Sequence, residues 1–488
     1  MLRPMAVAVA TATATATAAV VLLAGCGGSD DQSSDSKPDS AGASSATTPS
    51  PPPIASFDPP KAFAAASAFA LEGQKGVGTG MVGRSTLVAS LTGVTGRDIA
   101  AQKEPWMVPA AEATTTETVA LTRPVGVQLD GKDVVAIAYV QNDKGNGTQK
   151  AKGQVLFQWI DSADGKKVAE VVTDLTAALG PGEGVDDVVG QAYDAATGQV
   201  AIGLKPAGQA GRQKVGATFT VYADPTTQKS TVIPSFDVAG VLNGVVAGAN
   251  GGNAQGQGEA TILVADAATG KITKRTPTNQ AVLHVAGHGS KRAYLSGTTR
   301  KSDADNNNTV YAVDIPTGAV VPIKGLVQDG TMNFGCLGDE ATAVVCTARA
   351  ADGNHEIIGI DDTTGKKAWG YTEKASNRVV PSVTAAFHGI IYAQTEAQPV
   401  LMDAATGEDV KVSTPAPPES ASPTDGGTPG SSQSSDPSSQ TNSPANANGS
   451  VMSLYDGKLR SPHAVTEYGG VYVQGNYKRA LIALSPTA

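Results

Sequence analysis

The stretch Asp361-Asp-Thr-Thr-Gly365 is one copy of a motif that recurs along the chain: a β-rich apolar run, then Asp, two residues, Thr and Gly. In a hairpin, Asp accepts a hydrogen bond from a backbone N–H two residues on, and Gly supplies the positive φ that the turn needs. Each copy therefore predicts a tight turn between antiparallel strands. Clear copies begin at Asp194, Asp266, Asp314, Asp361 and Asp403, and a degenerate copy begins at Asp224.

Two kinds of apolar run accompany these turns. One, such as Val310–Val313, precedes the Asp directly, and a second, such as Ala293–Ser296, lies further upstream. Their Val, Ile and Tyr residues suit the pleated, half-buried surface of a strand. The last four turns begin 48, 47 and 42 residues apart, which is the period of a four-stranded propeller blade. The pattern predicts an all-β chain with a single β-propeller.

The number of blades follows from matching each upstream run with a downstream Asp or, at the end, with a closing strand. Seven pairs result, so we expect seven blades. The last pair, Val471–Gln474 with Ala480–Leu484, leaves no chain for an outer strand. An N-terminal strand, either Phe63–Leu71 or Ser85–Leu91, is therefore expected to close the ring and remove an open sheet edge. Eight blades, with one built from residues 75–110, is the alternative.

Composition agrees with this class and argues against others. The 488 residues include 56 glycines, and only 5% are aromatic, which suits many short strands and turns. The formal net charge is -9, and Lys and Arg form no cluster. Nucleic acid is not an expected partner, because its phosphates require clustered cations.

The N-terminus is typical of an export signal. Arg3 is the sole charge in residues 1–26, and an uncharged run ends in Leu23-Ala-Gly-Cys26. This ending resembles the lipobox of bacterial lipoproteins, which implies lipidation of Cys26 and anchoring on the extracytoplasmic face of the cell membrane. The alternative is an ordinary transmembrane anchor in which Cys26 is incidental.

Two segments rich in Ser, Pro, Gly and Asp offer little to bury. Such compositions do not offset their ordering entropy. Residues 27–56 therefore predict a disordered tether, and residues 413–450 predict a disordered surface loop. Strand-like sequence resumes at Val451, so this loop interrupts a propeller domain of residues 57–488.

The eleven residues from Gly359 to Trp369, which read Gly-Ile-Asp-Asp-Thr-Thr-Gly-Lys-Lys-Ala-Trp, resemble the repeat of pyrroloquinoline-quinone-type β-propellers. That repeat has Trp four residues after the Gly, and residues 312–318 match its first part. The positions equivalent to Trp369 after the other turns are Ile202, Lys274, Pro322 and Lys411. The chain therefore also resembles the wider propeller superfamily, WD-repeat proteins included, with its binding and scaffold members. The quinone enzymes carry adjacent cysteines, and no Cys-Cys pair exists here, so no cofactor is expected.

Cys336 and Cys346 flank a predicted hairpin. In an exported protein, cysteines on neighbouring strands are expected to form a disulfide. The alternative is two separate buried thiols.

Other candidate sites have simpler interpretations. His284 and His288 lie in a strand-like stretch, where four residues span about 13 Å, too far to share a metal ion. The segment Asp303–Thr309 alternates oxygen ligands as calcium loops do, but it lacks their Gly and closing Glu. Gly248–Gly252 has no helix to form a phosphate site. Trp106 is either a ligand-contacting rim aromatic or a core residue. No catalytic, cofactor-binding or metal-binding residue is predicted.

These observations favour a membrane-anchored extracytoplasmic binding or scaffold module, not an enzyme, with a protein or cell-envelope component as partner. The alternatives are a quinone-dependent dehydrogenase or another propeller enzyme, and an extracytoplasmic sensor.

Overall fold

The computed structural model describes residues 58–71, 77–100, 103–111, 116–146, 148, 150–180, 184–207, 218–250, 260–300, 306–326, 334–349, 355–411, 454–475 and 479–487. The expected signal segment with Cys26, the tether of residues 27–56 and the loop of residues 413–450 lie outside these ranges. Within the described ranges, no helix is both long and apolar enough to cross a membrane.

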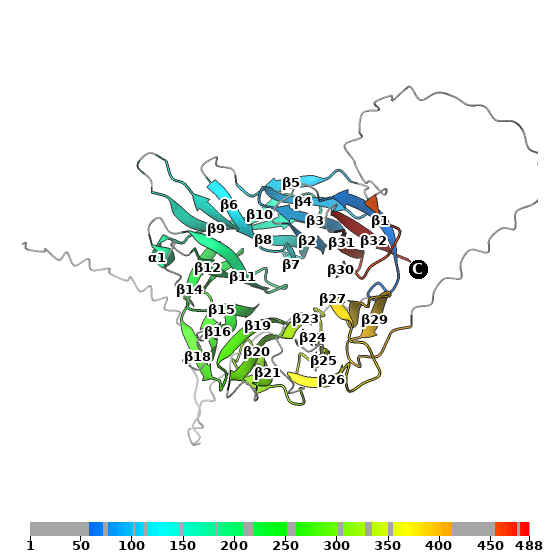
Figure 1. Cartoon of the computed structure of the whole chain (residues 1–488). Coiled ribbons are helices and arrows are strands. Elements are labelled where there is room, and N and C mark those ends of the chain that lie inside the picture. Colours follow the sequence, from blue (N-terminus) through cyan, green and yellow to red (C-terminus); the bar gives the residue numbers. More distant parts are fainter. Residues whose placement is uncertain are drawn as a thin grey trace, which may run out of the picture. The chain divides into compact units, whose positions relative to one another are not determined.

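The strands form eight antiparallel sheets (Figure 1), numbered here as blades and given from inner to outer strand. Blade 1 consists of β30 (Ala464–Thr466), β31 (Gly469–Gln474), β32 (Ala480–Pro486) and β1 (Phe63–Ala70). Blade 2 consists of β2 (Gly78–Val82), β3 (Ser85–Ser90), β4 (Gly93–Asp98) and β5 (Trp106–Pro109). In blade 3, β6 (Thr116–Leu121) and β7 (Val125–Leu129) pair with successive parts of β8 (Lys132–Asp143), which β9 (Lys152–Asp161) and β10 (Lys167–Asp174) follow.

A four-residue helix, α1 (Thr176–Leu179), leads to blade 4, which consists of β11 (Val185–Tyr193), β12 (Val200–Pro206), β13 (Phe219–Asp224) and β14 (Lys229–Pro234). Blade 5 consists of β15 (Asp237–Leu242), β16 (Val245–Asn250), β17 (Thr261–Asp266) and β18 (Ile272–Pro277). Blade 6 consists of β19 (Val282–His288), β20 (Arg292–Arg300), β21 (Asn306–Asp314) and β22 (Val320–Pro322).

Blade 7 consists of β23 (Phe334–Gly338), β24 (Ala343–Arg349), β25 (His355–Asp361) and β26 (Lys366–Thr372). Blade 8 has three strands, β27 (Ser382–Phe387), β28 (Ile390–Gln394) and β29 (Pro399–Asp403). A single bridge between Met402 and Asp409 stands where its outer strand would lie.

The blades form a closed ring. Inner strands of neighbouring blades contact one another in an unbroken circuit: β30 with β2, β2 with β7, β6 with β11, then β15, β19, β23, β27 and β30 again. This arrangement confirms the prediction of a single all-β propeller. The count is eight and not the seven that we favoured, because residues 78–109 build blade 2. This is the eighth blade that the sequence analysis gave as the alternative, from residues 75–110. It was not counted among the seven because no Thr-Gly pair follows Asp98, although Asp98 Oδ1 accepts the Ala100 N–H (3.0 Å) as the other turn aspartates do.

The first strand of the ring also closes it. β1 pairs with β32 from Phe63 opposite Pro486 to Ala70 opposite Ala480. The expectation that Phe63–Leu71 supplies the outer strand is therefore confirmed. The other candidate, Ser85–Leu91, contains β3 of blade 2 instead.

The Asp-x-x-Thr-Gly motif forms the predicted turn. Asp266 Oδ1 accepts hydrogen bonds from the backbone N–H (2.9 Å) and the hydroxyl (2.6 Å) of Thr269, and Gly270 has a φ of 70°. The turns at Asp314, Asp361 and Asp403 repeat this bonding. In the degenerate copy, Gln228 takes the glycine position with a φ of 52°.

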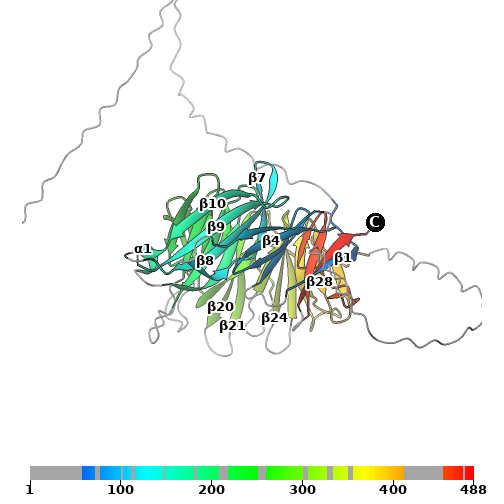
Figure 2. The ribbon, with the colours of Figure 1, turned by 90° about the horizontal axis from the view of Figure 1, so that it is seen from above.

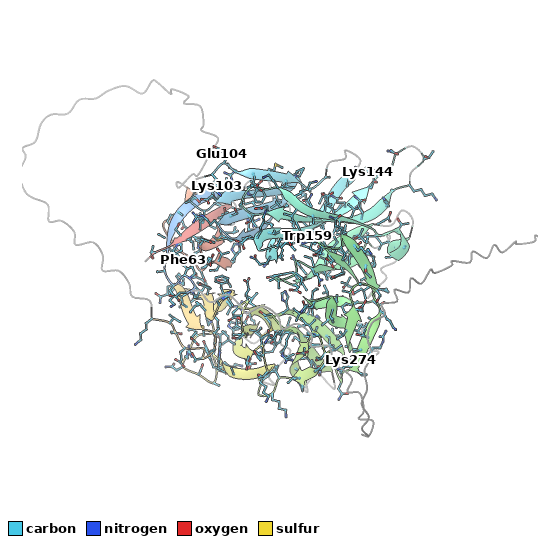
Figure 3. The ribbon with its side chains drawn as sticks, turned by 180° about the vertical axis from the view of Figure 1, so that it is seen from behind. Phe63, Lys103, Glu104, Lys144, Trp159 and Lys274 are labelled. Carbon is cyan, nitrogen blue, oxygen red and sulfur yellow. A yellow bond between two sulfur atoms is a disulfide. The ribbon has the colours of Figure 1, made fainter. Side chains whose placement is uncertain are left out.

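The motif has a second role, because side chains of the preceding blade donate hydrogen bonds to carbonyl groups in or beside these turns. The three tryptophans do so: Trp106 Nε1 to Ser162 (3.1 Å), Trp159 Nε1 to Gly198 (2.7 Å) and Trp369 Nε1 to Ala404 (2.9 Å). Where Trp is absent, other donors act: Thr231 Oγ1 to Ala268 (2.9 Å), Lys274 Nζ to Thr317 (3.3 Å) and Arg292 Nε to Asp362 (2.8 Å). Figure 3 labels Trp159 and Lys274 among the side chains of the ring. Six consecutive blade interfaces, from 2–3 to 7–8, are joined in this way.

All three tryptophans therefore dock on a neighbouring blade, although only Trp369 stands four residues after the glycine of a recurring turn. Trp106 and Trp369 each cover a glycine on the neighbouring strand, Gly96 and Gly359, where a Cβ would lie 2.1 Å from the indole ring. Trp106 is thus a docking residue between blades 2 and 3. The sequence contained a signal for this docking role. Trp106 follows Gly96-x-Asp98 at the same spacing at which Trp369 follows Gly359-x-Asp361.

Cys336 and Cys346 are paired across β23 and β24, and their sulfur atoms are bonded at 2.05 Å. Both residues are buried between blades 6 and 7, in a cluster that includes Tyr294 and Ile358. The disulfide therefore joins the inner hairpin of blade 7 in the core of a blade interface.

Candidate functional site

Strands alternate in direction, so the turns after the first and third strands of each blade share one face of the ring. We call this the turn face; the longer connections leave from the opposite face. Figure 2 shows the strands running between the two. The inner turns, between the first and second strands, surround the turn-face end of the ring interior.

Four inner turns carry a non-glycine residue in the left-handed region: Asp130 (φ 51°), Asn243 (48°), Glu340 (62°) and His388 (42°). Asp130, Asn243 and His388 are each followed by a glycine with positive φ, as in a type I′ turn. Asn and Asp adopt this conformation readily, whereas for Glu it costs about 1 to 2 kcal/mol. Unfavourable backbone held in place by its surroundings is a feature of functional positions.

Tyr193 and His288 meet inside the ring. Tyr193 ends β11 of blade 4 and His288 ends β19 of blade 6, and their rings lie edge to face with centroids 5.0 Å apart. Blade 5 separates these blades along the ring, so the contact crosses the interior. Burial raises the pKa of Tyr193, and the negative charge of Glu340 in blade 7 raises it further. Three side chains from three blades therefore converge at this end.

Burial also controls the charges of this group. The surrounding protein atoms desolvate Glu340, although its side chain keeps access to solvent, and this raises its pKa to about 7, with a further contribution from the neighbouring Asp339 carboxylate. Burial lowers the pKa of His288, against the opposing effect of a hydrogen bond between Nδ1 and the Gly289 carbonyl (3.2 Å). At neutral pH, His288 and Tyr193 are thus uncharged, while Glu340 is close to its titration midpoint.

The neighbouring inner turns extend this group into a ring of recognition side chains. The N–H groups of His388 and Gly389 donate to the backbone carbonyl (2.6 Å) and carboxylate (2.9 Å) of Asp339, which joins the turns of blades 7 and 8. In blades 1 and 2, the Arg84 guanidinium lies over the Tyr468 ring at 5.5 Å. We define the turn-face rim as Arg84, Tyr193, His288, Glu340, His388 and Tyr468.

The rim offers aromatic faces, imidazoles, a guanidinium and a carboxyl group on short turns. Tyr468 and Glu340 are exposed, and His288 and His388 are half-buried. Such groups suit recognition of a partner surface, where Tyr and Arg supply much of the binding energy. Among these residues, the sequence analysis had singled out only His288.

The other predicted site residues do not join the rim. His284 and His288 both lie on β19, four residues apart along an extended strand, and so occupy different depths. In the described part of the chain, no group of three or more His, Cys, Asp or Glu side chains is arranged to hold a metal ion. Residues 301–305 and 251–259, with the first three residues of the candidate calcium segment and part of the glycine-rich stretch, lie outside the described residues.

Comparison of the chain with known proteins shows that it resembles other proteins in fold alone. No protein-family model matches the chain, and no curated protein matches it in sequence. It is similar to the β-propeller domain of the Trilobed protease from Pyrococcus furiosus (9% identity, TM-score 0.34, 58% of this chain and 82% of that chain). It is also similar to dihydro-heme d1 dehydrogenase NirN (16%, 0.41, 75% and 75%) and to an uncharacterized protein of Listeria monocytogenes (10%, 0.33, 70% and 98%).

Replacing Glu340 with glutamine should change how stability depends on pH. Between its ordinary pKa of 4.5 and the folded value of about 7, this carboxyl group is protonated in the folded chain and ionised in the unfolded chain. Its contribution to stability is therefore present below pH 4.5 and is lost as pH rises through 7. Solvent screens the exposed side chain, so we expect Glu340→Gln to gain less than about 1 kcal/mol at pH 8 and nothing at pH 4.

Thermal melts at several pH values measure this difference. Glu467→Gln, which makes the same change on the inner turn of blade 1, is the control and should follow the wild type. A Glu340→Gln profile parallel to that of the wild type across the whole range would show that Glu340 does not titrate near neutrality.

Proposed function

We propose that the chain is an extracytoplasmic binding module without enzymatic activity, which docks a protein or cell-envelope component on the turn-face rim. The lipobox-like ending at Cys26 supports a second part of the proposal, anchoring to the cell membrane through the lipidated cysteine. The observation that carries the proposal is the convergence of rim side chains from blades 1, 2, 4, 6, 7 and 8 on one end of the ring.

Rigidity of the rim supports a binding role. Its side chains sit at or beside turns of two to six residues, and hydrogen bonds join some of these turns to neighbouring blades, as between Asp339 and Gly389. A partner would therefore bind without first ordering a flexible loop, and less binding free energy is lost to entropy. The edge-to-face pair of Tyr193 and His288 holds two of the six side chains before any partner arrives.

The acidic residues of the recurring motif have structural roles. The carboxylates of Asp266, Asp314, Asp361 and Asp403 accept hydrogen bonds within their own turns. Burial raises the pKa of Asp362, whose carboxylate accepts hydrogen bonds from the Tyr294 hydroxyl (2.7 Å) and the Lys291 N–H (2.8 Å) of blade 6. These groups support the frame, which favours a binding role over acid–base catalysis.

Cross-linked purification of the intact chain from its own membranes tests the proposal. The rim variant combines Tyr468→Ala with His388→Asn, which keeps a residue that tolerates positive φ. The control variant combines Met107→Ala with Val172→Ala, two exposed apolar residues on the outer strands β5 and β10 (62% and 54% accessible). We expect recovery of the bound partner to fall at least about tenfold for the rim variant alone.

Equal recovery with both variants would contradict the assignment of the rim. Stoichiometric quinone absorbance in the purified chain would favour the dehydrogenase alternative. The anchor is tested in the same preparation, because Cys26→Ser should move the chain from the membrane fraction to the soluble fraction.

A further inference from the structure

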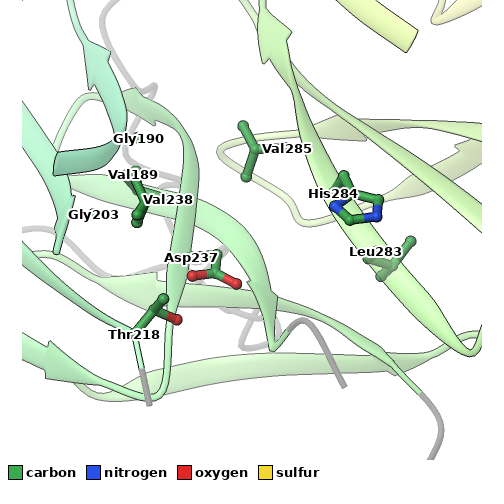
Figure 4. A pocket seen from close by; sticks show the side chains of 9 residues that line it. All are labelled: Val189, Gly190, Gly203, Thr218, Asp237, Val238, Leu283, His284 and Val285. Atoms are coloured by element: carbon green, nitrogen blue, oxygen red, sulfur yellow. The ribbon is translucent and has the colours of Figure 1, made fainter. Parts of the chain in front are cut away.

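A cavity of about 270 Å³ lies among the inner strands of blades 4, 5 and 6 (Figure 4). Val189 of β11, Asp237 of β15 and His284 of β19 line it, together with Thr218, Leu283 and Val285. Val189 and His284 each precede a rim residue, Tyr193 and His288, by four positions, which is about 13 Å along a strand. The cavity is therefore a second site, deeper along the same strands than the rim.

The walls of the cavity combine aliphatic side chains with polar groups, among them one carboxylate. Val189, Leu283 and Val285 supply aliphatic surface, and Val189 is 48% accessible, so the cavity is open to solvent. Asp237 and Thr218 stand on one wall and His284 on another (Figure 4). Among the residues that the structure describes, no Lys or Arg lines the cavity.

The Asp237 carboxylate is incompletely compensated. Burial raises its pKa, and this effect outweighs the Thr218 hydrogen bond and the attraction of His284, which both lower it. A carboxylate in partly apolar surroundings gains most from a cationic partner that also forms a hydrogen bond. The described lining of the cavity therefore has one charged acceptor, Asp237, and no lysine or arginine that neutralises its charge.

We infer that this cavity binds an ammonium group carried on a small apolar body, with the ammonium on Asp237 and the body against Val189 and Leu283. An anion would be repelled by Asp237, and Mg²⁺ or Ca²⁺ requires more oxygen ligands than one carboxylate and one hydroxyl. A cavity of about 150 Å³ holds benzene, so this volume suits about ten heavy atoms. A free amine and a lysine side chain of a partner protein share this chemistry.

Ligand-observed NMR and calorimetry on the full chain test the inference with three phenyl compounds of similar size that differ in charge: 2-phenylethylammonium, 2-phenylethanol and 3-phenylpropanoate. The ammonium compound should bind, and the neutral and anionic compounds should bind about ten- to a hundredfold more weakly. Asp237→Asn should weaken binding of the ammonium compound by a similar factor. Asp187→Asn is the matched control, because Asp187 is an exposed aspartate on β11 that does not line the cavity, and it should bind as the wild type does.

A second variant keeps the test valid if Asp237→Asn does not fold. His284→Lys places an ammonium on the wall that faces Asp237 and should exclude the added amine. The source of the ligand is distinguished with capped lysine and capped norleucine: competition by capped lysine alone indicates a partner side chain, and its failure to compete indicates a free amine. The inference is overturned if the alcohol binds as tightly as the amine, if neither Asp237→Asn nor His284→Lys weakens binding, or if no amine binds.

Discussion

Replacing Trp159 with alanine should lower the free energy of unfolding by about 3 to 5 kcal/mol. The Trp159 side chain is fully buried between blades 3 and 4 and stacks on Phe157 with ring centroids 6.1 Å apart. Its indole N–H donates to the Gly198 carbonyl (2.7 Å), so the variant loses burial, opens a cavity and leaves a buried acceptor unpaired. Denaturant unfolding followed by circular dichroism measures the loss.

Trp369→Ala is the matched comparison, because Trp369 makes the same kind of hydrogen bond from a half-buried position. We expect it to cost about half as much, since less apolar surface is withdrawn from water. If both variants lose the same free energy, then the hydrogen bond to the next blade and not the burial of the ring dominates the docking.

Removing the disulfide, with Cys336→Ala and Cys346→Ala together, should lower the free energy of unfolding by about 2 to 3 kcal/mol. The two cysteines are separated by 10 positions, so their bond closes a short loop and restricts the unfolded chain modestly. Both residues are also buried, and the variant loses their packing between blades 6 and 7. Unfolding of wild type and variant is compared with and without a reducing agent.

A reducing agent should bring the wild type close to the double variant and leave the variant unchanged. Thiol titration of the unfolded, unreduced wild type should detect neither of these two thiols. Free thiols at both positions would contradict the disulfide and would support the alternative of two separate buried cysteines.

The fold was largely predictable because its signals are local. A turn such as Asp266–Gly270 needs only five consecutive residues, and strand alternation follows from the apolar runs around it. The number of blades was harder to predict from the sequence. Asp98 begins a turn that lacks Thr and Gly, so this turn did not match the recurring motif. The docking of Trp106 was missed for a related reason: the tryptophan was sought four residues after a Thr-Gly turn, whereas Trp106 is recognised by its ten-residue spacing from Gly96, with which it pairs.

The candidate sites were hidden because they depend on the closed ring. Tyr193 and Glu340 are 147 positions apart, and nothing in their immediate neighbours indicates that the ring brings them together. The same holds for Asp237, which became notable only when β11 and β19 were placed on either side of it. The turn pairs Asp130-Gly131 and Asn243-Gly244 carried a usable signal, because Asp-Gly and Asn-Gly dipeptides mark tight hairpins.

The pairing of β1 with β32 determines how the ring responds to mechanical load. Tension applied at Phe63 along the axis of β1 would be parallel to the strand direction. The pairs from Phe63–Pro486 to Ala70–Ala480 would then be loaded together in shear, and not opened one after another from an end. The pairing in blade 1 therefore resists opening of the ring by a force on its N-terminal strand. The force needed to separate the strands depends on the number of paired residues in β1.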